Sequence, residues 1–355
     1  MRIIYAGGGT LGSVSPLLAV HQMLLQQGRQ VDALWVGTKD GPERDIIAEQ
    51  GIAFTTVSAP KLRRYWDWRT LLLPFTLPYG ILQARAVIKR FKPDVVVSAG
   101  SFVAVPVALA ARTKRIPSLI HQQDVTPSLT NKLLAPFASA ITVAFSSSLT
   151  AFSANKTTVT GNPVRADRQL TERAAALELF RFLPDVPIVL VLGGGTGASA
   201  LNRLVWDSLN DLVQFCQVIH LTGRGKMEVV AEHPRYRAFE FLGAELSAAY
   251  AAADLVVSRA GMGVLSELGS LGKAAALIPI PGSHQVANAI TFARNNAAII
   301  VSQTGLTQAD FTGKVKEIIE DKPLLANLGR NISKMLPPQA AAAVADLVRR
   351  LGGDG

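Results

Sequence analysis

Short runs of apolar residues recur along the 355-residue chain, and most of them stop at a glycine or a polar residue. Runs that are apolar almost throughout are typical of strands in parallel sheets, which helices cover on both faces. Segments between them place apolar residues at helical spacing, so the sequence predicts alternating strands and helices. We expect strands at residues 3–6, 33–36, 94–98, 117–121, 187–192, 217–222, 238–242, 254–257, 275–279 and 298–301.

One pattern, a strand followed by a glycine loop and a helix, occurs twice. Residues 3–6 lead into the loop 7–13 and then into a helix over residues 16–27, and the same order returns at residues 187–212. Two such starts, roughly a domain length apart, indicate an α/β protein with two doubly wound, Rossmann-like domains that face each other.

The boundary between the two domains is predicted from a turn. Gly-Asn-Pro at residues 161–163 is followed by a charged helix over residues 171–180. We therefore expect an amino-terminal domain over residues 1–162 and a carboxyl-terminal domain over residues 163–336. A helix at about residues 337–355 is expected to pack back on the first domain.

The composition narrows the class of protein. Hydrophobic residues make up 49% of the chain and charged residues 17%, so that sizeable cores can form. The net charge of +10 suits an acidic membrane surface or a phosphorylated substrate, and no run of Lys and Arg is long enough to indicate nucleic-acid binding. The single cysteine, Cys216, excludes an internal disulfide and a cysteine metal cluster. The first residues lack the pattern of a signal peptide, so we expect a cytoplasmic protein.

The first glycine loop, residues 7–13, fits neither of two common nucleotide-binding patterns. The second predicted strand ends in Gly37-Thr38-Lys39, without the acidic residue of a dinucleotide site. The loop also lacks the Gly-Lys-Ser/Thr of a P-loop. Neither kind of nucleotide site is expected here.

Residues 254–289 hold the polar and glycine residues that point most directly to a ligand. A predicted strand leads into the turn 258–263, whose glycines let the backbone approach a ligand, and then into a helix over residues 264–271. The first N–H groups of that helix suit an anion such as a diphosphate. Glu267, about a turn into the helix, suits the vicinal hydroxyls of a ribose. An ordinary βαβ unit with a glycine turn is the alternative interpretation.

The order of motifs in this stretch resembles one family. Ser-Arg-x-Gly at 258–261, Ser-Glu at 266–267 and His-Gln-x-x-Asn-Ala at 284–289 are similar to the donor-binding half of the MurG-type transferases, glycosyltransferase family 28. The resemblance implies the GT-B fold, in which two domains face a central cleft and the carboxyl-terminal domain binds UDP-N-acetylglucosamine. It implies the following donor-binding residues: Arg165, Gly194, Gly195, Thr196, Asn202, Leu246, Met262, Gly263, Val264, Glu267, His284, Gln285 and Asn288.

The first glycine loop carries a weaker part of the same resemblance. Residues 8–10, 12 and 16 match the family's amino-terminal signature, whereas Leu11 replaces a glycine and Ser13 replaces a histidine. Gly-Ser-Phe-Val at residues 100–103 resembles the family's Gly-Gly-Tyr-Val loop. The resemblance implies the following residues for binding the diphosphate of the acceptor: Gly9, Thr10, Gly12, Ser13, Ser101 and Phe102.

Three polar residues are candidates for the chemistry. Residues 121–124 read His-Gln-Gln-Asp where the family reads His-Glu-Gln-Asn, so one carboxylate is lost and another is gained two residues later. An inverting transfer needs a base that takes the proton of the acceptor hydroxyl. We look to Asp124 or His121, because Ser13 can at most position a phosphate or a hydroxyl. A hydrogen-bonded core histidine is an equally good interpretation of His121.

Residues 61–85 combine basic and aromatic side chains with an apolar run over residues 71–82 that contains two prolines. The run is too short and too broken to span a bilayer. A buried, kinked helix and an interfacial membrane patch both stay open, and Trp66 and Trp68 among arginines favour the patch. The resemblance implies a peripheral protein at the anionic surface of the inner membrane, on the cytoplasmic face of the cell membrane.

The resemblance, together with these features, implies an inverting glycosyltransferase of peptidoglycan synthesis. The sugar of UDP-N-acetylglucosamine would pass to the C4 hydroxyl of N-acetylmuramyl-pentapeptide on a polyprenyl diphosphate. No metal is expected, because the sequence contains no metal-binding cluster and no Asp-x-Asp. No cofactor and no nucleic acid is expected either. Three alternatives stay open: a transferase with another lipid-linked acceptor, a UDP-N-acetylglucosamine 2-epimerase, which shares the fold, and a binding-only protein that has lost its base.

Overall fold

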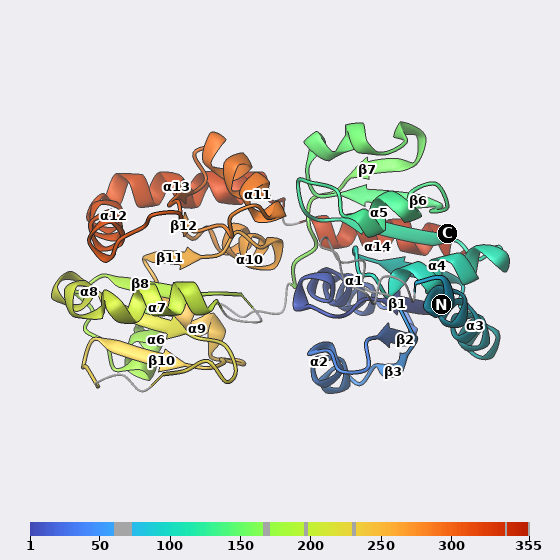
Figure 1. Cartoon of the computed structure of the whole chain (residues 1–355), viewed down its shortest axis with the longest axis horizontal. Coiled ribbons are helices and arrows are strands. Elements are labelled where there is room, and N and C mark those ends of the chain that lie inside the picture. The colour runs from blue at the N-terminus through green and yellow to red at the C-terminus, as the bar shows by residue number, and fades with distance from the viewer. Residues whose placement is uncertain (60–72, 166–170, 195–197, 229–231, 338, 354–355) are drawn as a thin grey trace. The chain divides into compact units, whose positions relative to one another are not determined.

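The computed structural model describes residues 1–59, 73–165, 171–194, 198–228, 232–337 and 339–353. The chain divides into two compact units, Met1–Ala166 together with Pro338–Gly355, and Asp167–Pro337. Each unit is built on one parallel β-sheet with helices packed against it (Figure 1). The predicted fold class, an α/β protein with two doubly wound units, is confirmed.

The first unit contains a seven-stranded sheet in the order β3-β2-β1-β4-β5-β6-β7, and all of the strand pairs are parallel. Ile3 in β1 pairs with Ala33 on one side and with Val95 on the other. The strands are β1 (Arg2–Ala6), β2 (Asp32–Gly37), β3 (Ala53–Thr56), β4 (Val95–Ser98), β5 (Ser118–Gln122), β6 (Ala140–Val143) and β7 (Thr157–Val159).

Alternation along β1 divides its side chains between two hydrophobic cores. Ile3 and Tyr5 belong to the core on one face of the sheet, and Ile4 and Ala6 belong to the core on the other. Burial on both faces explains the continuous apolar run. The helices are α1 (Ser15–Gln26), α2 (Glu43–Glu49), α3 (Leu73–Phe91), α4 (Ala104–Thr113), α5 (Leu129–Leu134) and α14 (Ala340–Leu351), and short 3-10 turns cover Leu11–Ser13, Ser146–Ala151 and Ala154–Lys156.

Helix α14 belongs to the first unit although it follows the second unit in the chain (Figure 1). It packs against α1, and Val344, Ala345 and Val348 lie in the same hydrophobic core as Leu17 of α1. All three of these α14 side chains are buried. The first unit is therefore assembled from two distant parts of the sequence.

The second unit contains a six-stranded parallel sheet in the order β10-β9-β8-β11-β12-β13. Val189 and Val191 of β8 lie in a core that residues of α7, α8 and α12 complete. The strands are β8 (Ile188–Leu192), β9 (Gln217–Leu221), β10 (Tyr236–Phe239), β11 (Leu255–Ser258), β12 (Ala275–Leu277) and β13 (Ile299–Ile300). The helices are α6 (Arg173–Phe180), α7 (Ser199–Asp207), α8 (Leu209–Phe215), α9 (Leu246–Ala252), α10 (Met262–Leu271), α11 (His284–Arg294), α12 (Gln308–Glu320) and α13 (Lys322–Met335).

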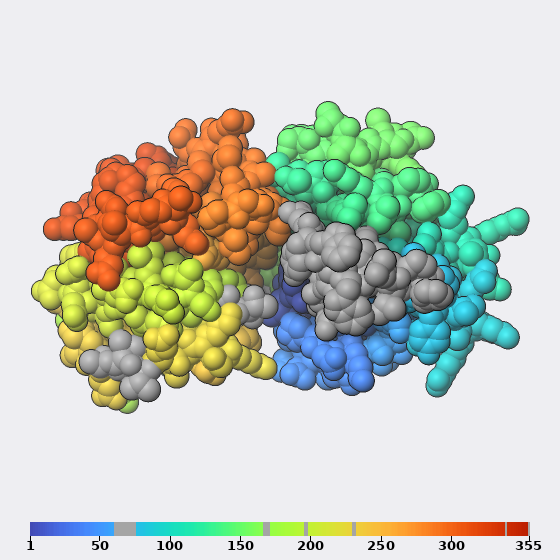
Figure 2. All heavy atoms as spheres, in the orientation of Figure 1, coloured from blue at the N-terminus to red at the C-terminus, as the bar shows by residue number. Residues whose placement is uncertain are grey.

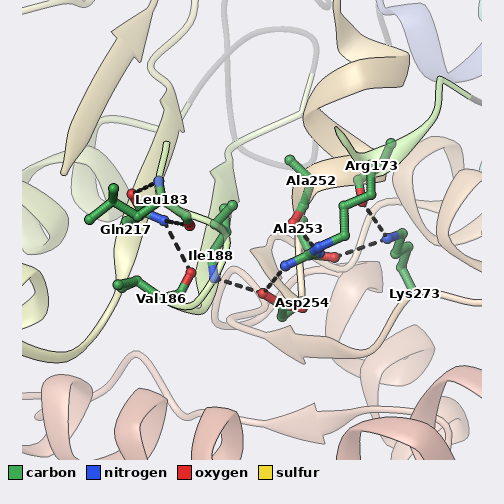
Figure 3. A network of polar contacts seen from close by, with 10 residues as sticks. Arg173, Leu183, Val186, Ile188, Gln217, Ala252, Ala253, Asp254 and Lys273 are labelled. Carbon is green, nitrogen blue, oxygen red and sulfur yellow. Dashed lines mark hydrogen bonds and ion pairs between the residues drawn. The ribbon is translucent and has the colours of Figure 1, made fainter. Parts of the chain in front are cut away.

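A polar network joins the amino-terminal ends of strands in the second unit (Figure 3). The carboxylate of Asp254, just before β11, accepts hydrogen bonds from the backbone N–H of Ile188 at 2.8 Å and from the guanidinium of Arg173 at 2.9 Å. The ammonium of Lys273 donates to the carbonyl oxygen of Ala253 at 2.9 Å, and burial, helped by the charge of Arg173, lowers the pKa of Lys273. Parallel sheets bind ligands at the opposite, carboxyl-terminal edge, so this network fixes α6 to the sheet away from any such ligand.

The structure differs from the sequence-based expectation mainly at the sheet edges. Strands β3, β6 and β7 were not predicted, and β10 begins at Tyr236 rather than at residue 238. These strands are short and carry threonine or arginine, so they lack a continuous apolar run. The helix expected over residues 199–212 is two helices, because Ser208, with φ −98° and ψ 1°, ends α7 and begins α8.

Residues 61–72 of the basic and aromatic segment singled out at residues 61–85, which include Trp66 and Trp68, lie outside the described residues. Within its described part, α3 continues through Pro78. Tyr79 and Leu82 are 58% and 60% exposed, whereas Ala84 and Ile88 are buried, so α3 is amphipathic rather than fully buried. No helix in the described part of the chain is long and apolar enough to cross a membrane.

Candidate active site

The strand order of each sheet indicates where a ligand would bind. From β1 the chain proceeds to β2 and β3 on one side and then returns to place β4 on the other side of β1. In the second unit the same reversal occurs between β8 and β11. In open parallel sheets, ligands bind at the carboxyl ends of the strands at such a reversal. A ligand is therefore expected at the loops after β1, β4, β8 and β11.

The loop after β1 is held by side chains from other parts of the first unit. Gly9, with φ +82°, donates its backbone N–H to the carboxylate of Glu43 at 3.1 Å. The hydroxyl of Ser101, in the loop after β4, donates to the carbonyl oxygen of Gly8 at 2.9 Å. A Cβ atom built on Gly9 would lie 2.7 Å from Cε1 of Phe102, so this ring packs directly on the glycine. The structure thus brings the two predicted acceptor-binding loops together.

Ser13 lies at the end of the same loop and is buried. Its hydroxyl donates to the carbonyl oxygens of Gly8 at 3.5 Å and Thr10 at 3.3 Å. Both of these partners are backbone carbonyl oxygens, which are far too weakly basic to remove the serine proton. In this arrangement Ser13 shapes the loop, and of the predicted acceptor-binding residues Thr10 is the exposed one, beside half-buried Gly12.

Gln122, at the end of β5, organises the loop that carries Asp124. Its side-chain NH2 donates to the carbonyl oxygens of Asp124 at 2.8 Å and Thr126 at 3.2 Å. Its side-chain oxygen accepts from the amide of Asn131 at 2.8 Å and from the backbone N–H of Ser128 at 3.2 Å. A carboxylate cannot donate, so the glutamate of the resembling family could not make the first two bonds. Asp124 itself is half-buried.

His121 is engaged through both ring nitrogens. Nδ1 lies 2.9 Å from the hydroxyl oxygen of Thr142 in β6, and Nε2 lies 2.7 Å from the side-chain oxygen of Asn162. Burial lowers the pKa of His121 to about 4, so the imidazole is neutral at physiological pH. This geometry matches the alternative left open by the sequence, a hydrogen-bonded core histidine.

The loops after β1, β4 and β5 form one connected group. Gln123 donates from its side chain to the carbonyl oxygen of Ala99, at 3.2 Å, which joins the β5 loop to the β4 loop. The bond from Ser101 to Gly8 then joins the β4 loop to the β1 loop. A change in the conformation of one loop will therefore alter the conformation of the other two.

The corresponding place in the second unit is more open. A Cβ atom built on Gly194 after β8, or on Gly261 and Gly263 at the start of α10, would meet no atom within 4 Å. The amino terminus of α10 has no side-chain cap. Its first N–H groups, at Met262, Gly263 and Val264, therefore have the arrangement that suits an anion beside open space.

Of three predicted donor-binding residues on α11, one supports this turn from behind. Asn288 is fully buried, and its amide donates to the carbonyl oxygen of Ala260 at 3.1 Å. The side-chain oxygen of Gln285 accepts from the backbone N–H of Ile280 at 3.2 Å. His284, the first residue of α11, is exposed. Of these three residues, Asn288 acts on the shape of the turn through its hydrogen bond.

Glu267 lies on α10 and is held by a residue of the preceding helix. The hydroxyl of Tyr250 in α9 donates to Oε2 of Glu267 at 2.7 Å, and Tyr250 is buried. Leu246, at the start of α9, is half-buried. The carboxylate predicted to bind a ribose is thus oriented by a rigid aromatic side chain.

Asn202 is part of a buried network. Its side-chain oxygen lies 3.2 Å from Nε2 of His220, and its NH2 donates to the carbonyl oxygen of Thr222 at 2.8 Å. Nδ1 of His220 lies 2.9 Å from the hydroxyl of Tyr236. Burial lowers the pKa of His220 to about 3 and raises that of Tyr236 to about 12, so both are neutral. Asn202 positions the end of β9, and any contact with a ligand is an additional role.

Two further predicted donor residues, Gly195 and Thr196, lie outside the described residues. Arg165 is half-buried and belongs to the first unit, just before its boundary with the second. Within the described ranges, no group of three or more His, Cys, Asp or Glu side chains could hold a metal ion.

Comparison with known proteins identifies the family. The amino-terminal domain of glycosyltransferase family 28 matches residues 3–143, and its carboxyl-terminal domain matches residues 188–347. The UDP-N-acetylglucosamine--N-acetylmuramyl-(pentapeptide) pyrophosphoryl-undecaprenol N-acetylglucosamine transferase of Clostridium botulinum (strain Langeland) is 33% identical over 354 residues, which cover 98% of this chain and 99% of that protein. The protein of the same name from Lachnoclostridium phytofermentans is 35% identical over 326 residues, or 90% and 91% of the two chains. The chain belongs to glycosyltransferase family 28.

A solved structure agrees with this assignment. The crystal structure of MurG from Acinetobacter baumannii is 27% identical in sequence, has a TM-score of 0.75, and covers 98% of this chain and 99% of its own. The family 28 protein is a glycosyltransferase with a GT-B fold.

Three residues of this family 28 transferase support the two candidate ligand-binding places but were not among the predicted site residues. Glu43 holds the glycine loop through Gly9, and Tyr250 holds Glu267, as described above. Arg259, in the turn before α10, is buried and donates to the carbonyl oxygen of Ile278 at 2.8 Å and to the side chain of Gln303. The signals that could have pointed to them are the place of Arg259 in the Ser-Arg-x-Gly motif and the place of Glu43 two residues after Gly41.

Proposed function

We propose that this transferase moves N-acetylglucosamine from UDP-N-acetylglucosamine to the C4 hydroxyl of undecaprenyl-diphospho-N-acetylmuramyl-pentapeptide. The names of the full-length relatives support both substrates. The structural observation that carries the proposal is the uncapped amino terminus of α10, which borders open space and has the fixed carboxylate of Glu267 on the same helix. A diphosphate and a ribose are the groups that such a pair fits.

The donor would bind mainly to the second unit. The N–H groups at Met262, Gly263 and Val264 would stabilise the diphosphate and, in the transition state, the charge that develops on the leaving UDP. Glu267 would accept hydrogen bonds from the ribose hydroxyls. The following residues would contact or support the rest of the nucleotide sugar: Arg165, Gly194, Gly195, Thr196, Asn202, Leu246, His284, Gln285 and Asn288.

The acceptor would bind to the connected loops of the first unit, with its diphosphate near Thr10 and Gly12. We propose Asp124 as the base that removes the proton of the C4 hydroxyl while the anomeric carbon is attacked from the face opposite UDP. The support is physical: Ser13 faces only acceptors, and His121 is buried, neutral and bonded at both nitrogens. Asp124 is half-buried on a loop that Gln122 holds in place.

The first unit also offers a surface for a membrane. Tyr79 and Leu82 of α3 are exposed, as are Leu129, Leu133 and Phe137 at α5. Both helices pack against α4, and basic residues such as Arg85 and Lys132 lie on the same two helices. Side chains of α3, drawn in cyan, stand at the surface in Figure 2. Apolar side chains beside cations suit the anionic, cytoplasmic face of a membrane, where a polyprenyl-linked acceptor would be found.

One turnover experiment tests the function. The protein is incubated with UDP-N-acetylglucosamine, with and without undecaprenyl-diphospho-N-acetylmuramyl-pentapeptide in detergent, and UDP release and the disaccharide product are measured. We expect UDP release only with the acceptor, together with disaccharide formation. Conversion of the donor to its 2-epimer without lipid would identify an epimerase, and donor binding with no turnover would identify a binding-only protein. Turnover restricted to another lipid-linked acceptor would refute the proposed substrate.

A further inference from the structure

Glu43 is a fully buried carboxylate beneath the glycine loop of the first unit. It is the first residue of α2. Oε1 accepts from the backbone N–H of Thr38 at 2.7 Å and from the hydroxyl of Thr38 at 2.6 Å, and Oε2 accepts from the backbone N–H of Gly9 at 3.1 Å. Burying a carboxylate is costly unless its oxygens are hydrogen-bonded, and these three donors satisfy both oxygens.

Glycine backbone closes around this carboxylate. A Cβ atom built on Gly8 would lie 2.2 Å from Oε1, and one built on Gly41 would lie 2.0 Å from Oε2. A Cβ atom on Gly37 would lie 3.1 Å from Oε1. Glycine at positions 8 and 41 is therefore needed for the carboxylate to fit, whereas a Cβ atom on Gly37 would first meet the ring of Phe54, 2.6 Å away.

This arrangement changes what the glycine loop can bind. In doubly wound folds, N–H groups of the loop after the first strand often bind the phosphates of a ligand. Here the N–H of Gly9 already donates to an internal anion, and a fixed negative charge disfavours a phosphate at the same place. The Gly8 carbonyl on the neighbouring residue is held from another side by Ser101. The loop is thus fixed from two directions before any ligand arrives.

We propose that Glu43 is a positioning residue for the acceptor: an internal anion that occupies the phosphate position at Gly9, fixes the loop, and directs the acceptor's diphosphate to exposed Thr10 and half-buried Gly12. Gly9 itself, predicted from the sequence to contact the diphosphate, then serves the loop and not the ligand. The inference rests on the proposed function, because it assumes a diphosphate-linked acceptor.

The substitution Glu43→Gln tests the role of the charge at nearly constant shape. An amide presents an NH2 group toward either Gly9 or Thr38, where two donors would then face each other. We expect the KM for the undecaprenyl-linked acceptor to rise about 10-fold or more, while the affinity for UDP, measured by calorimetry, stays within about two-fold. Glu49→Gln, an exposed residue of the same helix, is the matched control and should change neither quantity.

A second variant separates loop positioning from stability. Thr38→Val removes one hydrogen bond to Glu43 but keeps the charge and the bond to Gly9. Both variants should lower the melting temperature, but only Glu43→Gln should raise the acceptor KM strongly. Equal effects of the two variants on that KM, or an unchanged KM in folded Glu43→Gln, would overturn the proposal.

Hydrogen exchange gives a readout that does not depend on turnover. Peptides covering residues 7–13 should exchange about 10-fold faster in Glu43→Gln than in the wild type or in Glu49→Gln, because the single amide oxygen cannot accept from both Gly9 and Thr38, and the loop loses part of its anchor. Unchanged exchange would refute the structural part of the inference. If the wild type does not use the lipid-linked acceptor at all, the proposed function fails, and the exchange result still decides whether Glu43 holds the loop.

Discussion

The hydroxyl of Tyr250 donates a 2.7 Å hydrogen bond to Oε2 of Glu267, and this bond joins helix α9 to helix α10 beside the open end of the sheet. Tyr250 is buried, so its ring cannot move without disturbing the core of the second unit. A carboxylate held by a rigid partner loses less conformational freedom when it binds a ligand. The orientation of Glu267 is therefore set before the nucleotide arrives.

Tyr250→Phe should weaken UDP binding by about 3- to 10-fold, because one hydrogen bond to a charged group is lost and Glu267 gains freedom. Calorimetric titration with UDP measures the effect. Glu267→Ala should cost more, on the order of 1.5–3 kcal/mol, since the ribose then loses its charged acceptor. Tyr5→Phe, in the core of the first unit, is the control. Equal UDP affinities in wild type, Tyr250→Phe and Glu267→Ala would show that this carboxylate does not bind the ribose.

Asp124→Asn should lower turnover by about 10²-fold or more with UDP affinity retained, because the amide cannot accept the proton of the acceptor hydroxyl. Single-turnover measurements with saturating substrates report this step directly. His121→Ala should reduce the rate of the folded protein less. A rate in Asp124→Asn within a few-fold of wild type would rule out this residue as the base.

Gln122→Glu should lower turnover by about 10-fold, with a modest loss of melting temperature. The new carboxylate would face the carbonyl oxygens of Asp124 and Thr126, which now accept hydrogen bonds from the Gln122 amide. Gln214→Glu, at an exposed position of the second unit, controls for the added charge. Wild-type turnover in Gln122→Glu would mean that the loop does not depend on these bonds.

His121 predicts a pH dependence of stability. Burial lowers its pKa from 6.5 to about 4 in the folded protein, so below about pH 6.5 the unfolded chain binds a proton that the folded chain does not. The free energy of unfolding should fall as the pH decreases from about 6.5 toward 4, and this contribution is fully retained above that range. Between pH 7 and pH 5 the wild type should lose about 2 kcal/mol more than His121→Gln.

Denaturant titrations of both proteins at several pH values measure this difference, and the comparison cancels the contribution of His220. His284→Gln, at an exposed position, serves as the reference substitution. Parallel pH curves for wild type and His121→Gln would contradict the assignment of a buried, neutral imidazole.

Replacing Tyr79 and Leu82 together by serine should reduce binding to anionic vesicles by about 10-fold, because two exposed apolar side chains no longer enter the interface. Co-sedimentation with phosphatidylglycerol vesicles measures binding, which should also weaken with salt. Leu183→Ser, at a leucine 56% exposed in the second unit, is the control. An equal loss in both variants, or none in either, would remove α3 from the proposed membrane surface.

The sequence predicts the central strands of this protein well, because burial on both faces requires a continuous run of apolar residues. Strand β8, and strand β1 from Ile3 onward, are buried on both faces and consist of apolar or aromatic residues. An edge strand such as β7, Thr-Thr-Val, buries little surface and therefore has no continuous apolar run that would predict it. The glycine loops could also be located, since a strand, a glycine run and a helix follow one another within a few residues.

The contacts that support the site could not be predicted, because they join residues far apart in the sequence. Glu43 reaches Gly9 across 34 positions, and Tyr250 reaches Glu267 across 17. Residue type alone also cannot separate a ligand-binding side chain from a buried support. His121, Asn202 and Asn288 have the chemistry of binding residues, yet each is hydrogen-bonded inside the protein. Their contact with substrates stays a prediction.

The place of α14 has a consequence for synthesis on the ribosome. Its side chains complete the core around Leu17 of α1, yet they are translated after the whole of the second unit. The second unit can therefore fold while the apolar face of α1 is still uncovered, although proteins generally fold from the amino-terminal domain first. We expect the nascent first unit to depend on chaperones, and stalled chains that end before residue 340 to be cut by protease first near α1.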